Sequence, residues 1–276
     1  MSLKSGSALC SLAVALLALA PAAHADILAS DHFDIPSYTA GLLAGQTVGG
    51  TGFTGSWVQT PGLTGGLSII NPGLVGRPVV TSTNTGNSAT FANGGFTIGS
   101  GQLFLSYDMT ASAPLDGTRL DLNIGNIAQA AFLGGISNTG NFNFRTSAAF
   151  GSVANAQTNI SEVGAHHLVG VLDFSNNQIS IFVDPSATSF YYPNGTNNAN
   201  ASAVWTAAVS PTLTGYSLFD NLSDQATFDN VVFSTDGPSV GVASTPEPGS
   251  VALLVGMGTT GAGCLVRRRR KARKSA

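Results

Sequence analysis

Three histidines in the central part of the chain could supply a general base or bind a metal ion: His32, His166 and His167. A serine hydrolase of the common kind would also carry a Gly-x-Ser-x-Gly turn, and the sequence contains none. On a strand, the adjacent pair His166 and His167 would point to opposite faces, so the two rings could not hold one metal ion together. We therefore expect ordinary positions near strand ends for these histidines.

The acidic residues of the sequence do not form a recognisable glycosidase pattern. A glycosidase needs two carboxyl groups about 5 to 9.5 Å apart across the scissile bond. The central part of the chain has a single glutamate, Glu162, and no Glu-x-Asp-x-x-Glu string. Two aspartates could serve only in an unusual site, so the sequence predicts a protein that is not an enzyme.

Aromatic rings next to asparagines could stack on a sugar. The run 190–195 places Tyr191 and Tyr192 in a loop, where binding residues often lie. Trp57 and Trp205 could act similarly, but large aromatic side chains dominate protein cores, and we expect both to be buried. Tyr191 and Tyr192 are therefore the predicted ligand-binding residues.

The central part of the chain, from Asp26 to Asp236, is strongly acidic. Thirteen carboxylates face three arginines and no lysine, a net charge of −10; the arginines are Arg77, Arg119 and Arg145. Nucleic acid is excluded as a partner, since phosphate binding requires a clustered basic surface. Both cysteines lie in the terminal segments, so this region has neither a disulfide nor a thiolate metal site.

Calcium would suit such an acidic surface, because it prefers carboxylate and carbonyl oxygens. Asp220, Asp224 and Asp229 form the closest cluster, but no Asp-x-Asp-x-Asp-Gly loop occurs. The sequence predicts no cofactor, with Ca²⁺ left open as an alternative.

Short alternating segments separated by glycine, asparagine, threonine and serine predict the elements that carry these residues. Thr118–Ile124 alternates apolar and polar side chains, as does Gln178–Asp184, and Ser175-Asn176-Asn177 predicts a hairpin turn before the latter. Further predicted strands are Leu67–Ile70, Val79–Thr81, Ala89–Ala92, Leu103–Met109, Asn141–Arg145, His167–Phe174, Tyr216–Phe219 and Thr227–Phe233. About ten to twelve such strands without a long helical period predict an all-β fold, a two-sheet antiparallel β-sandwich.

Residues 1–25 have the features of a secretory signal peptide. Lys4 precedes the apolar run Ala8–Ala20, which is too short to span a bilayer, and Ala23 and Ala25 form a small-x-small cleavage site. We expect signal peptidase to cleave after Ala25 and the protein to be exported.

Residues 246–276 combine three features in a fixed order. Pro246, Glu247 and Pro248 come first, and residues 249–266 follow without a charge. The basic cluster comes next: Arg267, Arg268, Arg269, Arg270 and Lys271. At about 1.5 Å per residue, a helix over 249–266 would be near the minimum length for crossing the membrane, with the basic cluster inside. The sequence predicts a single, weakly anchored transmembrane helix.

This order of Pro-Glu-Pro, short apolar helix and arginine cluster resembles the PEP-CTERM sorting signal of exosortase substrates. The resemblance implies that an exosortase, a membrane cysteine transpeptidase, cuts near Pro-Glu-Pro. The precursor would be held transiently in the membrane, and the product would be extracellular or on the cell surface. The resemblance also implies a link with exopolysaccharide or biofilm export.

The segments His167–Phe174 and Ile179–Pro185 resemble the central hairpin of concanavalin A-like (laminin-G-like) jelly rolls. Phe228–Phe233 resembles the last strand of such domains, and Asp31–Asp34 the first. This resemblance implies a jelly roll over residues 26–233, followed by a linker over 234–245.

These features together predict a secreted or surface-associated, non-catalytic protein that is a structural component of the extracellular matrix and associates with exopolysaccharide. A lectin-like carbohydrate-binding module, with or without calcium, is the first alternative. A polysaccharide hydrolase is the second.

Overall fold

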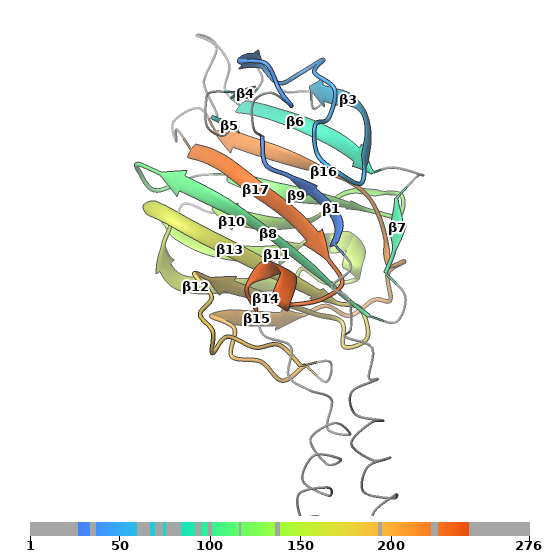
Figure 1. The fold of residues 1–276 in the computed structure, drawn as a ribbon. Coiled ribbons are helices and arrows are strands. Elements are labelled where there is room, and N and C mark those ends of the chain that lie inside the picture. The colour runs from blue at the N-terminus through green and yellow to red at the C-terminus, as the bar shows by residue number, and fades with distance from the viewer. Residues whose placement is uncertain are drawn as a thin grey trace, which may run out of the picture.

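A computed structural model describes residues 27–33, 37–59, 67–69, 74–75, 84–91, 95–98, 101–115, 117–135, 139–192, 195–221 and 226–242. Within them the chain forms antiparallel sheets, which confirms the predicted all-β class (Figure 1). The predicted processing residues lie outside these ranges: Ala23, Ala25, Pro246, Glu247, Pro248, Arg267, Arg268, Arg269 and Arg270. No helix among the described residues has the length and apolar character that a membrane crossing requires.

The larger sheet has nine strands. Eight follow in the order β15 (Ala201–Val204), β14 (Gln178–Val183), β13 (Gly164–Asp173), β8 (Gln102–Ala111), β17 (Ala226–Ser234), β5 (Leu74–Val75), β4 (Ser68–Ile69) and β2 (Gly41–Leu42). The ninth, β1 (Ile27–Asp31), also pairs with β17, so that Ile27 lies opposite Ser234. The first and last strands are therefore neighbours (Figure 1).

The second sheet has eight strands. Seven follow in the order β12 (Asn155–Ser161), β11 (Asn141–Thr146), β10 (Ile127–Gly135), β9 (Thr118–Ile124), β16 (Thr212–Asn221), β6 (Asn84–Phe91) and β3 (Phe53–Gln59). The eighth, β7 (Phe96–Thr97), pairs with β16. β10 pairs antiparallel with both β9 and β11, which places three consecutive strands side by side.

Each predicted strand within the described ranges corresponds to an observed strand, and β9 has the predicted bounds. Val79–Thr81 lies outside those ranges. The expected number of ten to twelve was too low, since the described residues alone form seventeen strands. Several of these, such as β4 and β5, are only two residues long and carry too little pattern to be recognised.

One hydrophobic core contains apolar side chains of both sheets, including Leu105 on β8 and Leu120 on β9. Trp57 and Trp205 belong to it and are 1% and 3% exposed, as predicted. The indole N–H of Trp57 donates to the hydroxyl of Tyr38 over 3.0 Å, so this buried donor is satisfied.

The hairpin between β13 and β14 confirms the turn predicted at Ser175-Asn176-Asn177. Asn177 has φ of 51°, a left-handed conformation that asparagine tolerates better than most residues. The buried carboxylate of Asp173 accepts the backbone N–H groups of Ser175 (3.0 Å) and Asn176 (2.9 Å), which fixes the turn.

A second, smaller core covers the other face of the nine-stranded sheet. Val240 and Val242 pack there with Phe104, Val169 and Tyr191, among others. Val240 ends the short 3₁₀ helix η3 (Pro238–Val240), visible as the orange-red coil in Figure 1. The predicted linker 234–245 is therefore packed on the sandwich as far as Val242, because its two valines bury apolar surface against β8 and β13.

Candidate ligand-binding hollow

Tyr191, one of the two predicted ligand-binding residues, is buried in the structure. Its side chain is 2% exposed, and its ring meets that of Phe104 edge-on at 6.1 Å. Its hydroxyl donates to Oδ2 of Asp173 over 3.0 Å. Tyr191 is therefore a structural residue that seals the smaller core, while the neighbouring Tyr192 is half-buried and stacks edge-on against Phe190 at 4.9 Å.

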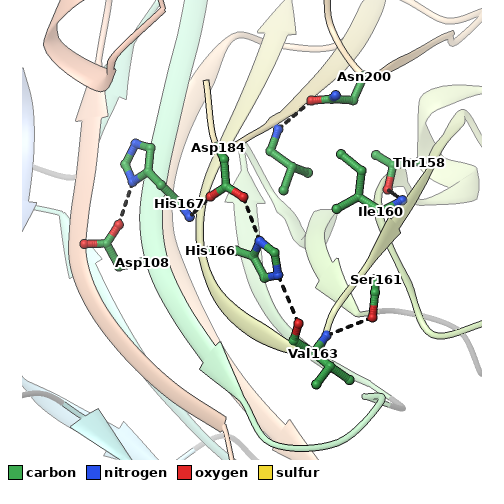
Figure 2. Close-up of polar contacts among 10 residues, drawn as sticks. Asp108, Thr158, Ile160, Ser161, Val163, His166, His167, Asp184 and Asn200 are labelled. Atoms are coloured by element: carbon green, nitrogen blue, oxygen red, sulfur yellow. Dashed lines mark hydrogen bonds and ion pairs between the residues drawn. The ribbon is translucent and has the colours of Figure 1, made fainter. Parts of the chain in front are cut away.

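His166 and His167 point to opposite sides of β13, as predicted (Figure 2). His166 places Nδ1 2.8 Å from Oδ2 of Asp184 and Nε2 3.3 Å from the carbonyl oxygen of Val163. His167 places Nδ1 2.6 Å from Oδ1 of Asp108. No group of three or more His, Cys, Asp or Glu side chains in the described ranges is arranged to hold a metal ion.

A polar chain continues from His167 across the nine-stranded sheet. Asp108 accepts the side-chain N–H of Asn230 over 2.6 Å, and Asn230 in turn lies 2.8 Å from Nδ1 of His32. Nε2 of His167 lies 3.3 Å from the carbonyl oxygen of Val240. Burial opposes the charged imidazole, but the hydrogen bond and the charge of Asp108 outweigh it and raise the pKa of His167. The same hydrogen bond lowers the pKa of Asp108.

Two of the three aspartates considered for calcium lie on strands of different sheets. Asp220 is a buried residue of β16 and accepts the hydroxyl of Thr118 over 2.7 Å. Asp229 lies on β17, in the other sheet. Asp224 lies outside the described residues.

A hollow of about 400 Å³ lies over three neighbouring strands of the eight-stranded sheet, on the face away from the shared core. Its lining is Arg119, Phe132, Arg145, Thr146, Ser147, Ala148 and Val153. Phe132 on β10 lies directly opposite Asp121 on β9 and Arg145 on β11. The alternation of strand side chains therefore brings two arginines and one aromatic ring to the same face.

Arg119 is held firmly at one side of the hollow. Its Nε donates to Oδ1 of Asp121 over 2.7 Å, and Nη1 donates to the carbonyl oxygen of Gly117 over 3.0 Å. The guanidinium carbon lies 4.7 Å from the ring centre of Phe219 and 5.3 Å from that of Phe132. Two cation–π contacts and two hydrogen bonds leave this side chain little freedom.

Asp121, beneath Arg119, is fully buried. Burial raises the pKa of its carboxyl to about 7, against the opposing effect of the Arg119 charge. Its Oδ2 atom has no hydrogen-bond partner among the described residues. The charge beside Arg119 therefore changes near neutral pH.

Arg145, by contrast, is not held by a carboxylate among the described residues. Its side chain is exposed, and it forms no ion pair within the described ranges. A guanidinium carries five N–H donors in a planar fork that matches carboxylate and sulfate oxygens. The hollow thus presents a free fork beside a fixed positive charge.

The wall of the hollow is built by the turn between β11 and β12. The 3₁₀ helix η2 (Ala148–Phe150) ends at Gly151, whose φ of 81° favours glycine. Phe150 anchors this turn in the core, edge-on to Trp205 at 5.1 Å. The Ser147 hydroxyl is buried without a partner among the described residues, and Val153 is 45% exposed.

The sequence did not predict this site. Arg119 and Arg145 lie on predicted strands, but β10 between them was not predicted. Ile127–Gly135 is rich in alanine and glycine and lacks clear alternation, so the strand that unites the two arginines left no signal. The third arginine, Arg77, lies outside the described residues.

No protein-family profile and no curated protein matches the chain. Among solved structures, the globular domain of T. cruzi calreticulin is 12% identical, with 89% of this chain and 100% of that one covered at a TM-score of 0.49. The binding domain of botulinum neurotoxin serotype D is 9% identical, with 76% and 47% covered at a TM-score of 0.48. That of serotype C1 is also 9% identical, with 74% and 50% covered at 0.47. The chain spans about half the length of these neurotoxin domains, and a shared function does not follow from likeness at this level.

Proposed function

We propose that this chain is the precursor of an exported, non-catalytic protein that associates with extracellular polysaccharide and binds it in the hollow over β9, β10 and β11. The observation that carries the proposal is the composition of that hollow. It combines the half-buried ring of Phe132 with guanidinium donors on a rigid sheet. Ligand sites are generally concave and mostly apolar, with a few fixed polar groups for orientation.

The body would be a jelly roll of the concanavalin A-like kind, in line with its two antiparallel sheets and the resemblance of its central hairpin. A structural role in the matrix fits this reading, because a matrix protein that binds polysaccharide need not transform it. The proposal includes no cofactor; calcium assistance is the alternative, and it would require ligands beyond the described residues or from the bound sugar.

The route to the outside follows from the two ends of the sequence. Signal peptidase would remove residues 1–25, and the segment 249–266 would hold the precursor in the membrane until an exosortase cuts near Pro246-Glu247-Pro248. The mature protein would then be extracellular or attached to the cell surface.

The test is retention of the full-length protein, in mild detergent, on immobilised polysaccharides of different chemistry. Phe132→Leu keeps an apolar side chain but removes the aromatic face, and we expect it to weaken retention several-fold. Val58→Ala is the matched control, because Val58 is 61% exposed on β3 at the far edge of the same sheet. No retention of a folded wild-type protein on any polysaccharide would refute the proposed function.

A further inference from the structure

We infer that the hollow selects acidic polysaccharides, with an anionic group of the sugar paired to the Arg145 guanidinium while the Phe132 ring lies against the sugar ring. This inference rests on the proposed function and narrows its ligand to one chemical class. The anionic group is a carboxylate or a sulfate ester, since both present the paired oxygens that a guanidinium fork binds.

The placement of positive charge is the first support. The body carries a net charge of −10 and three arginines, and the two that the structure describes both line the hollow. The acidic remainder of the described body repels anions, so within it an anionic ligand would be directed to this hollow.

The different bonding of the two arginines is the second support. Arg119 already donates to Asp121 and to a carbonyl oxygen, and two aromatic rings enclose its guanidinium. It can act on a ligand through its charge without rearrangement. Arg145 has no such carboxylate partner among the described residues, so its fork is the group that remains to contact an anion.

The geometry of the strands is the third support. Arg145 and Phe132 are directly opposed on neighbouring strands, and directly opposed side chains have Cβ atoms about 4.5–5.5 Å apart. One sugar residue can therefore meet both side chains together, with its apolar face on the ring and its charged substituent at the fork. Arg145 is the specificity-determining residue in this arrangement, and Arg119 a positioning residue.

Salt should affect this binding in an unusual way. Only one or two charged contacts hold the ligand, while the −10 body repels a polyanion at long range. Added salt screens that repulsion over about 8–10 Å, so affinity should change little between low and physiological salt. A protein with a broad basic surface would instead lose affinity steeply.

The experiment uses the full-length protein with Arg267, Arg268, Arg269, Arg270, Lys271, Arg273 and Lys274 replaced by serine, because this basic cluster would itself bind polyanions. It measures the affinity for a polyuronate, dextran sulfate, neutral dextran and single-stranded DNA. We expect binding to at least one acidic polysaccharide, at least tenfold tighter than to neutral dextran and to DNA. Arg145→Gln should weaken this binding about tenfold to a hundredfold, and Arg145→Lys less, because lysine keeps the charge without the fork. The polyuronate and dextran sulfate arms identify the anionic group.

Val58→Asp is the matched control. It makes the net charge more negative by the same amount as Arg145→Gln, but on the exposed far edge of the sheet, and should leave affinity unchanged. Equal affinity for neutral and acidic polysaccharides would overturn the inference and leave the proposed function standing. Preferred binding of DNA, or acidic binding unaffected by Arg145→Gln, would also overturn it. Absence of binding to every polysaccharide by the folded protein would remove the proposed function itself.

Discussion

Nδ1 of His167 lies 2.6 Å from Oδ1 of Asp108, while Nε2 of the same ring lies 3.3 Å from the carbonyl oxygen of Val240. Both partners of the ring are acceptors when Asp108 is ionised, so the pair favours the doubly protonated imidazole. This ring therefore links β8 and β13 to the segment that packs on the outer face of their sheet.

The stability supplied by this pair should depend on pH. Because folding raises the pKa of His167, this residue contributes fully to stability below about pH 6.5. The contribution is lost as pH rises through the folded-state pKa. Because folding lowers the pKa of Asp108, this residue contributes to stability above about pH 4. The contribution is lost as pH falls through the folded-state pKa. We expect the pair to contribute less than about 1 kcal/mol to the free energy of unfolding, because the side chains of His167 and Asp108 are 35% and 43% exposed. Urea unfolding should show a larger deficit for His167→Gln at pH 5.5 than at pH 8.5; equal deficits would contradict the assignment.

Asp121 should also lower the stability of the protein as pH rises, in the same direction as His167 and opposite to Asp108. Its folded-state pKa of about 7 lies above that of an exposed aspartate, so the free energy of unfolding falls as pH rises from about 4 to 7. Asp121→Asn should reduce this dependence. Thermal unfolding of the wild type and of Asp121→Asn at pH 5 and 8 measures this dependence. Identical pH profiles would show that Asp121 is not the group that causes it.

Acidic ligands should bind more weakly as pH rises through the same range. Deprotonation of Asp121 places a negative charge beside Arg119, whereas the residues opposite it, Phe132 and Ser217, are uncharged. Tyr107 is the other titratable group coupled to Asp121, and burial keeps its pKa well above neutrality. We expect a several-fold loss of affinity from pH 6 to 8 in the wild type and a smaller one in Asp121→Asn.

Tyr191→Phe should affect stability and leave ligand binding intact. The hydroxyl donates to the buried Asp173 carboxylate, and its loss should cost about 1–2 kcal/mol of unfolding free energy. Tyr192→Phe is the control and should change stability by less than about 0.5 kcal/mol. Chemical denaturation measures both, and reduced polysaccharide binding by Tyr191→Phe would return this residue to the list of ligand contacts.

Glu247→Ala tests the proposed sorting route. If an exosortase reads Pro-Glu-Pro, the variant should accumulate as a longer, membrane-associated form, because the segment 249–266 is retained. Mass spectrometry and fractionation of cells and medium would detect it. Replacing Ser244 by alanine, outside the motif, should leave processing unchanged; the same mass and location for all three proteins would exclude the motif as the signal.

The sequence predicted those strands whose two faces differ. Thr118–Ile124 alternates apolar and polar residues, and the observed β9 has the same bounds. The turn at Asn176 and Asn177 was also predictable, because asparagine accepts the left-handed backbone that the hairpin uses. Local chemistry alone decides such features.

Features that depend on the order of strands were not predictable. Arg119 and Arg145 lie on one face only because β10 separates β9 from β11, and β10 carries no clear pattern. The burial of Tyr191 depends likewise on a second core outside the sandwich. A signal for that core did exist, since the unbroken apolar run from Leu168 to Leu172 is typical of a strand covered on both faces.

The pairing of β1 with β17 determines how the fold would respond to mechanical load. Ile27 lies opposite Ser234, so the two ends of the described sandwich meet at one pole. A pull between a surface attachment at the C-terminal side and a partner at the N-terminal side would first detach residues 235–242 from the smaller core and then act on this pair. The hydrogen bonds of the ladder would then open one after another, as in a zipper, instead of resisting together in shear. In a surface-attached copy under tension, β1 would separate from β17 before the strands that form the hollow are disturbed.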